Sequence, residues 1–177
     1  MTCLRVSFAG LGLLLLLSSV LAQRQRDPLT DPEIDQLRDT ALEPDFRLKL
    51  YVGFARARLA ALEQARSDPK TTDRSLVTHD RLQDFLDVYD ELNDNVDTYI
   101  ERKADLRKAL KAVIEGDTEF QAKLRALRDD ATAKKEETGQ YEFLLSNALD
   151  TLDSSVRDHR QLLTEQEEAA KHKKPKR

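Results

Sequence analysis

A heptad pattern between residues 82 and 113 is the feature that most constrains how this chain folds. Counting from Leu82 at position a, the a and d positions of five heptads carry Leu82, Phe85, Tyr89, Leu92, Val96, Tyr99, Lys103, Leu106, Leu110 and Val113. Nine of these ten side chains are apolar or aromatic, and Lys103 is the exception. Such a seam is typical of a helix in a coiled coil or bundle. We therefore expect one helix from about residue 75 to 115, ended by Gly116, with Asp117 as the N-cap of the next helix.

Prolines, glycines and polar connectors divide the rest of the chain into further expected helices. Pro32 marks the start of a short helix that runs to about residue 42, and Pro44 ends it because the residue before a proline is pushed out of the helical region. A second helix is expected from about residue 45 to 66, followed by a polar connector at 67–73. Apolar residues recur at helical spacing within 120–131 and 141–163. They predict two helices or one rod kinked at Gly139, and we favour the rod because a lone glycine costs only about 1 kcal/mol in a helix.

These segments predict an all-α fold, an elongated antiparallel helical bundle over residues 31–170. The helix at 45–66, the first half of the heptad helix and the C-terminal helix are expected to overlap as a three-helix bundle. The second half of the heptad helix and the residues after Gly116 are expected to project from it as a two-helix coiled-coil hairpin. A composition with 35% charged residues and only five glycines favours long helices.

The first 22 residues have the layout of a secretory signal peptide. Arg5 precedes an apolar run from Phe8 to Leu21, and Val20 and Ala22 stand at the −3 and −1 positions of a small-residue cleavage site. The run is shorter than the ~20 residues of a spanning helix, and an uncleaved anchor is the alternative. We expect an exported protein, periplasmic or secreted, with a flexible segment at 23–30. Cleavage removes Cys3, the single cysteine, so the mature chain is expected to fold without disulfides.

Carboxylates recur along the side of the heptad helix that lies opposite its apolar seam. The candidate acidic face consists of Asp80, Asp84, Asp87, Glu91, Asp94 and Glu101. One interpretation is a solvated face that orients neighbouring helices, each exposed pair contributing about 0.2–0.5 kcal/mol. The other is a docking strip for a basic protein partner or for cations. A Ca²⁺ site needs oxygens that converge on one point, which a straight helix does not provide, so we expect no metal site.

Sequence motifs of catalysis or cofactor binding do not occur in this chain. It has no Gly-x-Ser-x-Gly elbow, no glycine-rich phosphate loop and no His-Glu-x-x-His pair. Of the three histidines, His159 falls on the apolar stripe of the last helix and is expected in the core, with a pH switch or metal ligand as the alternative. We expect no enzymatic activity, no cofactor and no nucleic-acid partner.

The chain ends in a compact basic run at residues 171–177. Its bases are Lys171, Lys173, Lys174, Lys176 and Arg177. The charge density and Pro175 predict a disordered tail. Such a tail keeps the protein soluble or contacts an anionic membrane surface, at about 1 kcal/mol per base.

The patterns together favour an exported, non-enzymatic helical protein that acts through protein–protein contacts in the cell envelope, as a scaffold, an adaptor or a chaperone-like holdase. One alternative is an envelope protein that binds or senses cations through the acidic face and the histidines. Another is a protein held at an anionic surface by its basic tail. Self-association through the expected hairpin is a further expected contact, since two helices leave apolar edges uncovered.

Overall fold

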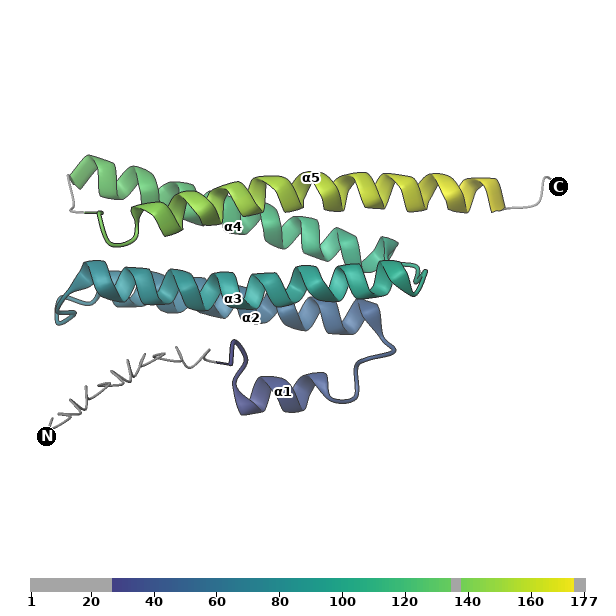
Figure 1. Ribbon diagram of the computed structural model, residues 1–177, viewed down its shortest axis with the longest axis horizontal. Helices are drawn as coiled ribbons and strands as arrows, with labels where there is room; N and C mark the ends of the chain where they lie inside the picture. Colours follow the sequence, from purple (N-terminus) through teal and green to yellow (C-terminus); the bar gives the residue numbers. More distant parts are fainter. Residues whose placement is uncertain (1–26, 135–137, 174–177) are drawn as a thin grey trace, which may run out of the picture.

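The computed structural model describes residues 27–134 and 138–173, apart from the side chain of Lys173. These residues form five helices and no strand: α1 (Asp31–Leu37), α2 (Pro44–Ser67), α3 (Arg74–Glu101), α4 (Arg107–Lys134) and α5 (Glu142–Lys173). The expected all-α helical bundle is confirmed (Figure 1). The expected signal peptide, most of the segment at 23–30 and the end of the basic tail lie outside the described residues.

The four long helices lie side by side, and α1 packs against α2 (Figure 1). Hydrogen bonds from Arg47 to Asn95 and from Arg66 to Thr78 show that α2 and α3 are antiparallel. α4 and α5 are antiparallel as well, whereas α2 runs parallel to α4 and α3 parallel to α5. Each long helix contacts two of the others, so the arrangement is a four-helix bundle. It differs from the expected three-helix bundle with a projecting hairpin.

The heptad seam does not belong to one helix, because the chain reverses in the middle of it. α3 ends at Glu101, and Lys103 adopts a left-handed conformation with φ 57°. The N–H of Lys103 donates to the carbonyl of Ile100 and the N–H of Ala104 to that of Tyr99, the two bonds of a Schellman helix end. The polar residue at position a therefore marks a turn, and the expectation of a single helix to residue 115 is wrong.

Gly116 lies inside α4 and is buried there, so it does not end a helix as we expected. A Cβ atom at this position would lie 2.8 Å from Cγ1 of Val52 in α2. The glycine therefore allows the backbone of α4 to approach α2 closely. Asp117 is likewise not an N-cap but a buried residue in the interior of α4.

The expected rod kinked at Gly139 is also wrong, because α4 and α5 are separate antiparallel helices. A turn in which the Tyr141 N–H donates to the Thr138 carbonyl leads into α5. The long helices cover each other along most of their length, and the apolar residues after the α3–α4 turn, such as Leu110 and Val113, are fully buried. The apolar edges expected on a free hairpin are therefore covered.

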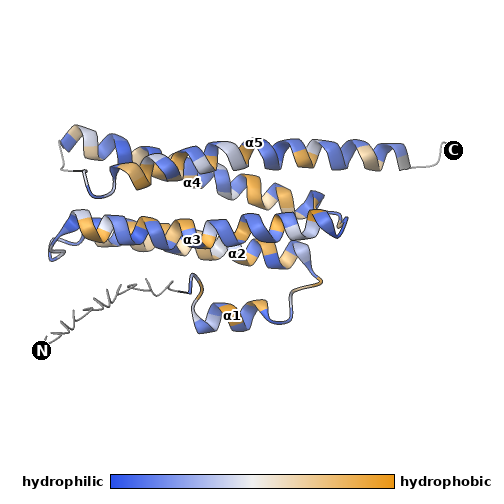
Figure 2. Cartoon of the chain, viewed as in Figure 1, coloured by the Kyte–Doolittle hydropathy of each residue, from blue (hydrophilic) through white to orange (hydrophobic). Residues whose placement is uncertain are grey.

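The core of the bundle consists of leucines and packed aromatic rings. Apolar residues recur along each of the four long helices (Figure 2). Phe85 stacks on Tyr89, and Phe120 meets both rings edge-on, with centroids 5.5 and 6.2 Å away. α5 continues past the ends of the other helices, and most of its residues after Leu163 are exposed or half-buried (Figure 1). No helix among the described residues is long and apolar enough to cross a membrane.

Candidate functional site

The six carboxylates of the predicted acidic face all lie on α3, as the heptad register indicates. Asp80, Asp94 and Glu101 are exposed, while Asp84, Asp87 and Glu91 are half-buried. Asp84 pairs with Arg81 at 3.1 Å, and Asp87 accepts a hydrogen bond from Gln83. These two contacts lie within α3 itself and do not involve a neighbouring helix.

The middle of this face is crowded with carboxylates, and we name Asp87, Asp90, Glu91, Asp94 and Asp97 the acidic strip. Partial burial raises the pKa of Asp90, and the charges of Asp87 and Asp94 raise it further. Partial burial also raises the pKa of Glu91, with Asp94 and Asp27 adding to the effect and Arg47 opposing it. Burial is thus the larger cause of both raised pKa values, and the charges of neighbouring carboxylates add to it.

The described residues contain no group of three or more His, Cys, Asp or Glu side chains placed to hold a metal ion. A Ca²⁺ site requires oxygen ligands that surround a common point. The acids of α3 instead follow one another along the helix axis.

Of the predicted tail residues, the structure describes the side chain of Lys171 alone, which is exposed on the last turn of α5. Lys173 is the final residue of α5. Its side chain and the residues Lys174, Lys176 and Arg177 lie outside the described part of the chain.

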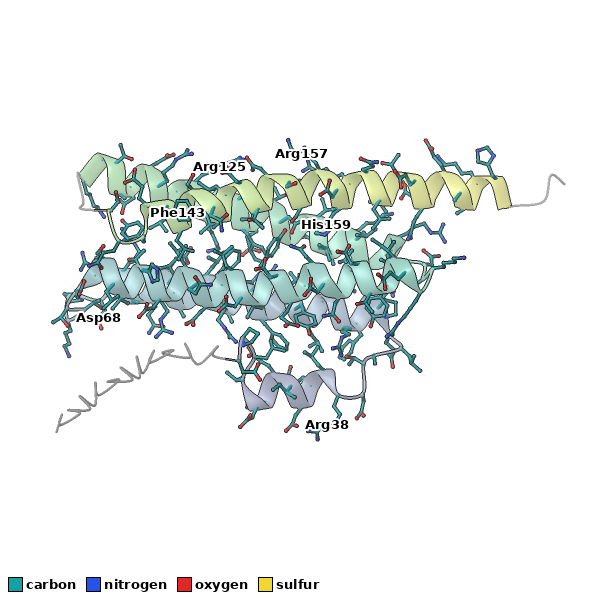
Figure 3. The ribbon with its side chains drawn as sticks, viewed as in Figure 1. Arg38, Asp68, Arg125, Phe143, Arg157 and His159 are labelled. Atoms are coloured by element: carbon teal, nitrogen blue, oxygen red, sulfur yellow. The ribbon has the colours of Figure 1, made fainter. Side chains whose placement is uncertain are left out.

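Three polar side chains from three helices meet in the core. Tyr89 Oη of α3 donates to Asp117 Oδ1 of α4 at 2.8 Å, and His159 Nδ1 of α5 lies 2.9 Å from Asp117 Oδ2. All three are buried, which agrees with the expectation for His159 (Figure 3). Burial raises the pKa of the Tyr89 hydroxyl, and the neighbouring Asp117 charge raises it further, so the hydroxyl stays a donor. Because each group has a partner, the cluster joins α3, α4 and α5.

Sequence reasoning missed Asp117, although the pattern contained a signal. Counting back from Leu124 in steps of four and three places Phe120, Asp117 and Val113 on the same apolar stripe. A charged residue on such a stripe is expected to find a partner in the core. The expectation of a helix end at Gly116 with an N-cap at Asp117 is therefore wrong because Asp117 belongs to the apolar stripe of α4.

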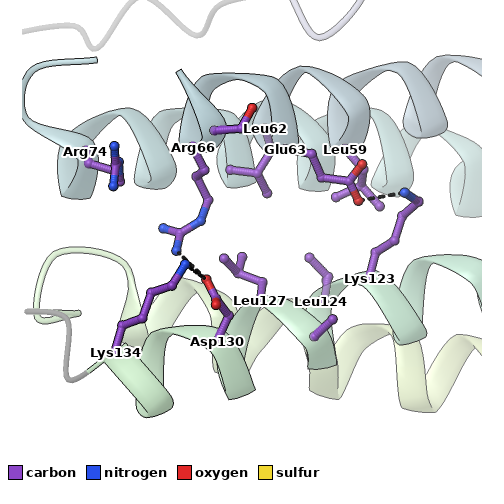
Figure 4. Close-up of a pocket in the computed structure, with 12 residues that line it drawn as sticks. Leu59, Leu62, Glu63, Arg66, Arg74, Lys123, Leu124, Leu127, Asp130 and Lys134 are labelled. Carbon is purple, nitrogen blue, oxygen red and sulfur yellow. Dashed lines mark hydrogen bonds and ion pairs between the residues drawn. The ribbon is translucent and has the colours of Figure 1, made fainter. Parts of the chain in front are cut away.

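A groove of about 290 Å³ lies between α2 and α4, toward their C-terminal ends (Figure 4). Its floor is apolar, and its rim carries charged side chains from both helices and from the start of α3. Lys123 Nζ lies 2.6 Å from Glu63 Oε1, and Lys134 Nζ lies 2.8 Å from Asp130 Oδ2. The groove combines residues about sixty positions apart in the chain, so no local sequence pattern indicates it.

No protein-family model, no curated protein sequence and no solved structure matches this chain.

Proposed function

We propose that this protein is an exported, non-enzymatic helical bundle that acts by binding another protein, and that the acidic strip of α3 contacts a basic segment of that partner. The observation that carries the proposal is the row of five carboxylates along α3, in which Asp90, Asp94 and Asp97 have no basic partner among the described residues. Partial burial raises the pKa of Asp90 and Glu91, and the neighbouring carboxylates raise it further. A positive partner lowers these pKa values and relieves the repulsion between the carboxylates.

Some acids elsewhere on the bundle, unlike those of the acidic strip, form ion pairs with bases of a neighbouring helix. Glu63 and Glu119 each pair with a base across the α2–α4 boundary, at 2.6 and 2.8 Å. A face that serves only to orient neighbouring helices is expected to form such cross-helix pairs. Asp90, Asp94 and Asp97 form no ion pair with any residue in the described ranges 27–134 and 138–173. These three carboxylates, which lie within residues 90–97 of α3, are therefore available to a partner.

Site-specific photocrosslinking tests this proposal. A photoreactive residue replaces Asp97, and the chain is expressed in its native host with and without Asp87→Asn, Asp90→Asn and Asp94→Asn. We expect a crosslinked protein partner that is lost in the triple amide variant and weakened by added salt. A control removes the same charge from exposed positions of α5, by Asp150→Asn, Asp158→Asn and Glu168→Gln. Equal crosslinking in both triple variants contradicts the proposal.

Export is tested separately from binding. We expect the purified mature chain to begin at Gln23, after cleavage behind Ala22, when its N-terminus is sequenced. A mature chain that retains residues 1–22 supports an uncleaved anchor instead.

A second candidate function is contact between the basic tail and an anionic membrane surface. The end of α5 projects from the bundle, which holds Lys171 away from the acidic strip (Figure 1). Deletion of residues 171–177 is expected to abolish binding to vesicles that contain anionic lipid. Binding that survives the deletion contradicts this candidate.

A further inference from the structure

Two stretches far apart in the sequence meet at one end of the bundle. We name these stretches, residues 38–49 and 101–111, the connector end. They contain the connector from α1 to α2, the start of α2, the α3–α4 turn and the start of α4 (Figure 1). Tyr99 Oη of α3 donates to the carbonyl of Ala41 at 3.0 Å, and Lys108 Nζ of α4 lies 3.1 Å from Asp45 Oδ2 of α2. The two stretches therefore form one surface.

Two large apolar side chains are exposed at the connector end. Leu42 in the α1–α2 connector is 89% exposed, and Phe46 in the first turn of α2 is 52% exposed. Phe46 lines a shallow hollow together with Lys49 and Lys108. A single exposed leucine is ordinary on a protein surface, so these side chains gain meaning only from the charges around them.

The connector end is positive although the chain as a whole is negative. It holds eight bases and five acids, a formal charge of +3, whereas the whole chain carries −4. Lys49, Arg102 and Lys103 are exposed there and form no ion pair with any residue that the structure describes. Bases without a partner therefore lie at the same end as the exposed apolar side chains.

The basic tail leaves the bundle at this end as well. α5 ends at Lys173, on the side of the molecule where the α3–α4 turn lies (Figure 1). Lys111 Nζ of α4 lies 3.4 Å from Glu167 Oε1 of α5, which ties this part of α5 to the connector end. Residues 174–177 add three more bases to the sequence. The positive charge of the tail therefore adjoins that of the connector end.

The opposite end of the bundle lacks this combination. Phe143, in the first turn of α5, lies there and is 85% exposed (Figure 3). Residues 67–75 and 138–146, which form that end, hold two bases and three acids, a formal charge of −1. The opposite end therefore provides exposed apolar side chains without a surplus of bases, and serves as a control.

We propose that the connector end docks on an anionic lipid surface. Leu42 and Phe46 insert between the headgroups, while Lys49, Arg102 and Lys103 contact the lipid phosphates. Interfacial segments place apolar side chains about 5–10 Å into the boundary between headgroups and acyl chains, and anionic lipid attracts nearby bases. This inference rests on the second candidate function, membrane contact, and extends it from the tail to the folded bundle. The acidic strip is not part of the contact.

Site-specific fluorescence tests the insertion on the mature chain. The chain from residue 23 onward contains no cysteine, so Leu42→Cys provides a single site for a polarity-sensitive dye. With vesicles of equal parts phosphatidylcholine and phosphatidylglycerol, we expect a blue shift from the dye at residue 42 and none from the control Phe143→Cys. An equal shift at both residues overturns the inference. So does a dye at residue 42 that stays in water while the chain binds the vesicles.

Paired substitutions measure the contribution of the apolar side chains. Leu42→Ser with Phe46→Ser is expected to weaken vesicle binding by at least roughly tenfold, because the double variant has less apolar area to remove from water. The matched control is Leu76→Ser with Phe143→Ser, which changes two exposed residues at the opposite end. Circular dichroism melting confirms that both double variants are folded. Equal vesicle affinities of the two overturn the insertion.

A second pair measures the contribution of the charges. Arg102→Gln with Lys103→Gln is expected to weaken vesicle binding by roughly fivefold per base. The matched control is Lys70→Gln with Arg74→Gln, since both bases are exposed at the opposite end. Equal losses in the two pairs overturn the assignment of the lipid phosphates to the α3–α4 turn.

Deletion of residues 171–177 separates this inference from the tail candidate. If the shortened chain still binds anionic vesicles and Leu42→Ser with Phe46→Ser removes that binding, the tail candidate fails and the inference stands. If the full chain binds but neither double variant at the connector end weakens it, the inference fails and the tail candidate stands. The absence of vesicle binding overturns both.

Polyglutamate distinguishes a lipid surface from an acidic protein, because it is a polyanion without an apolar phase. We expect the mature chain to bind polyglutamate more weakly than anionic vesicles, with no shift from the dye at residue 42. Binding as tight as to the vesicles identifies an acidic protein as the class of partner and overturns the lipid proposal.

Discussion

Nδ1 of His159 in α5 lies 2.9 Å from Oδ2 of Asp117 in α4, in a part of the core that is otherwise apolar. The second oxygen of Asp117 accepts the hydrogen bond of Tyr89 from α3. α3 and α4 are diagonal in the bundle, and this hydrogen bond connects them through its centre. The two hydrogen bonds offset the cost of burying the Asp117 carboxylate, whereas removing the carboxylate leaves both partners unsatisfied.

Replacement of Asp117 is therefore expected to destabilise the fold strongly. Asp117→Ala should lower the free energy of unfolding by about 3–5 kcal/mol, and Tyr89→Phe, which removes one donor, by about 1–2 kcal/mol. Urea denaturation followed by circular dichroism measures both values. The control is Asp158→Ala, because Asp158 is exposed. A loss below about 0.5 kcal/mol in Asp117→Ala shows that the hydrogen bonds among Tyr89, Asp117 and His159 contribute no stability.

Two helical glycines are expected to respond oppositely to the same substitution. A Cβ at Gly53 in α2 meets nothing within 4 Å, so Gly53→Ala should stabilise the protein by about 0.5–1 kcal/mol. A Cβ at Gly116 meets Val52, whose side chain is stiff, so Gly116→Ala should destabilise it by about 1–2 kcal/mol. Thermal melting of the Gly53→Ala and Gly116→Ala variants measures their difference in stability. If both variants are stabilised, α2 and α4 do not touch as closely as described.

The left-handed residue at the end of α3 predicts a gain from glycine. Lys103 has φ 57°, which costs roughly 1 kcal/mol for a residue with a Cβ atom. Lys103→Gly is expected to raise the free energy of unfolding by about that amount. Lys111→Gly, a matched change inside α4, should lower it by about 1 kcal/mol. A loss of stability in Lys103→Gly contradicts the left-handed conformation of residue 103 at the turn between α3 and α4.

The attachment of α1 is expected to depend on pH. Burial alone would raise the pKa of Glu33, but hydrogen bonds from Arg58 and Thr30 and the Arg58 charge outweigh it and hold the pKa below the ordinary value of 4.5. A carboxyl with a lowered pKa stabilises the fold above its unfolded pKa, and this contribution is lost as pH falls through the folded pKa. Acidification below 4.5 should therefore release α1.

Hydrogen exchange of the α1 amides between about pH 6 and pH 3 measures this release, after correction for the intrinsic exchange rate. In Glu33→Gln, α1 should be less protected at neutral pH and show no further loss on acidification. An unchanged pH profile in Glu33→Gln indicates that another carboxyl controls the attachment.

The acidic strip and the groove show how far the sequence predicts candidate sites. The carboxylates of the strip lie on one helix, so the heptad register places them on one face without knowledge of the neighbours. The groove is built from α2 and α4 and from Arg74, which become neighbours only through the chain reversals. Asp117 was detectable as a charge on an apolar stripe, but its partners Tyr89 and His159 come from other helices.

Hydrophobic periodicity in the chain is enough to predict the helices and the buried side of each, because the periodicity reflects local backbone geometry. The positions at which the helices reverse depend instead on how the helices pack against one another. Both α3 and α4 turn their apolar sides toward the same core. The heptad pattern of apolar residues therefore continues across the turn at Lys103 and does not reveal it. Gly116 is equally suited to a helix end and to a close approach between helices, and the position of Val52 decided between them.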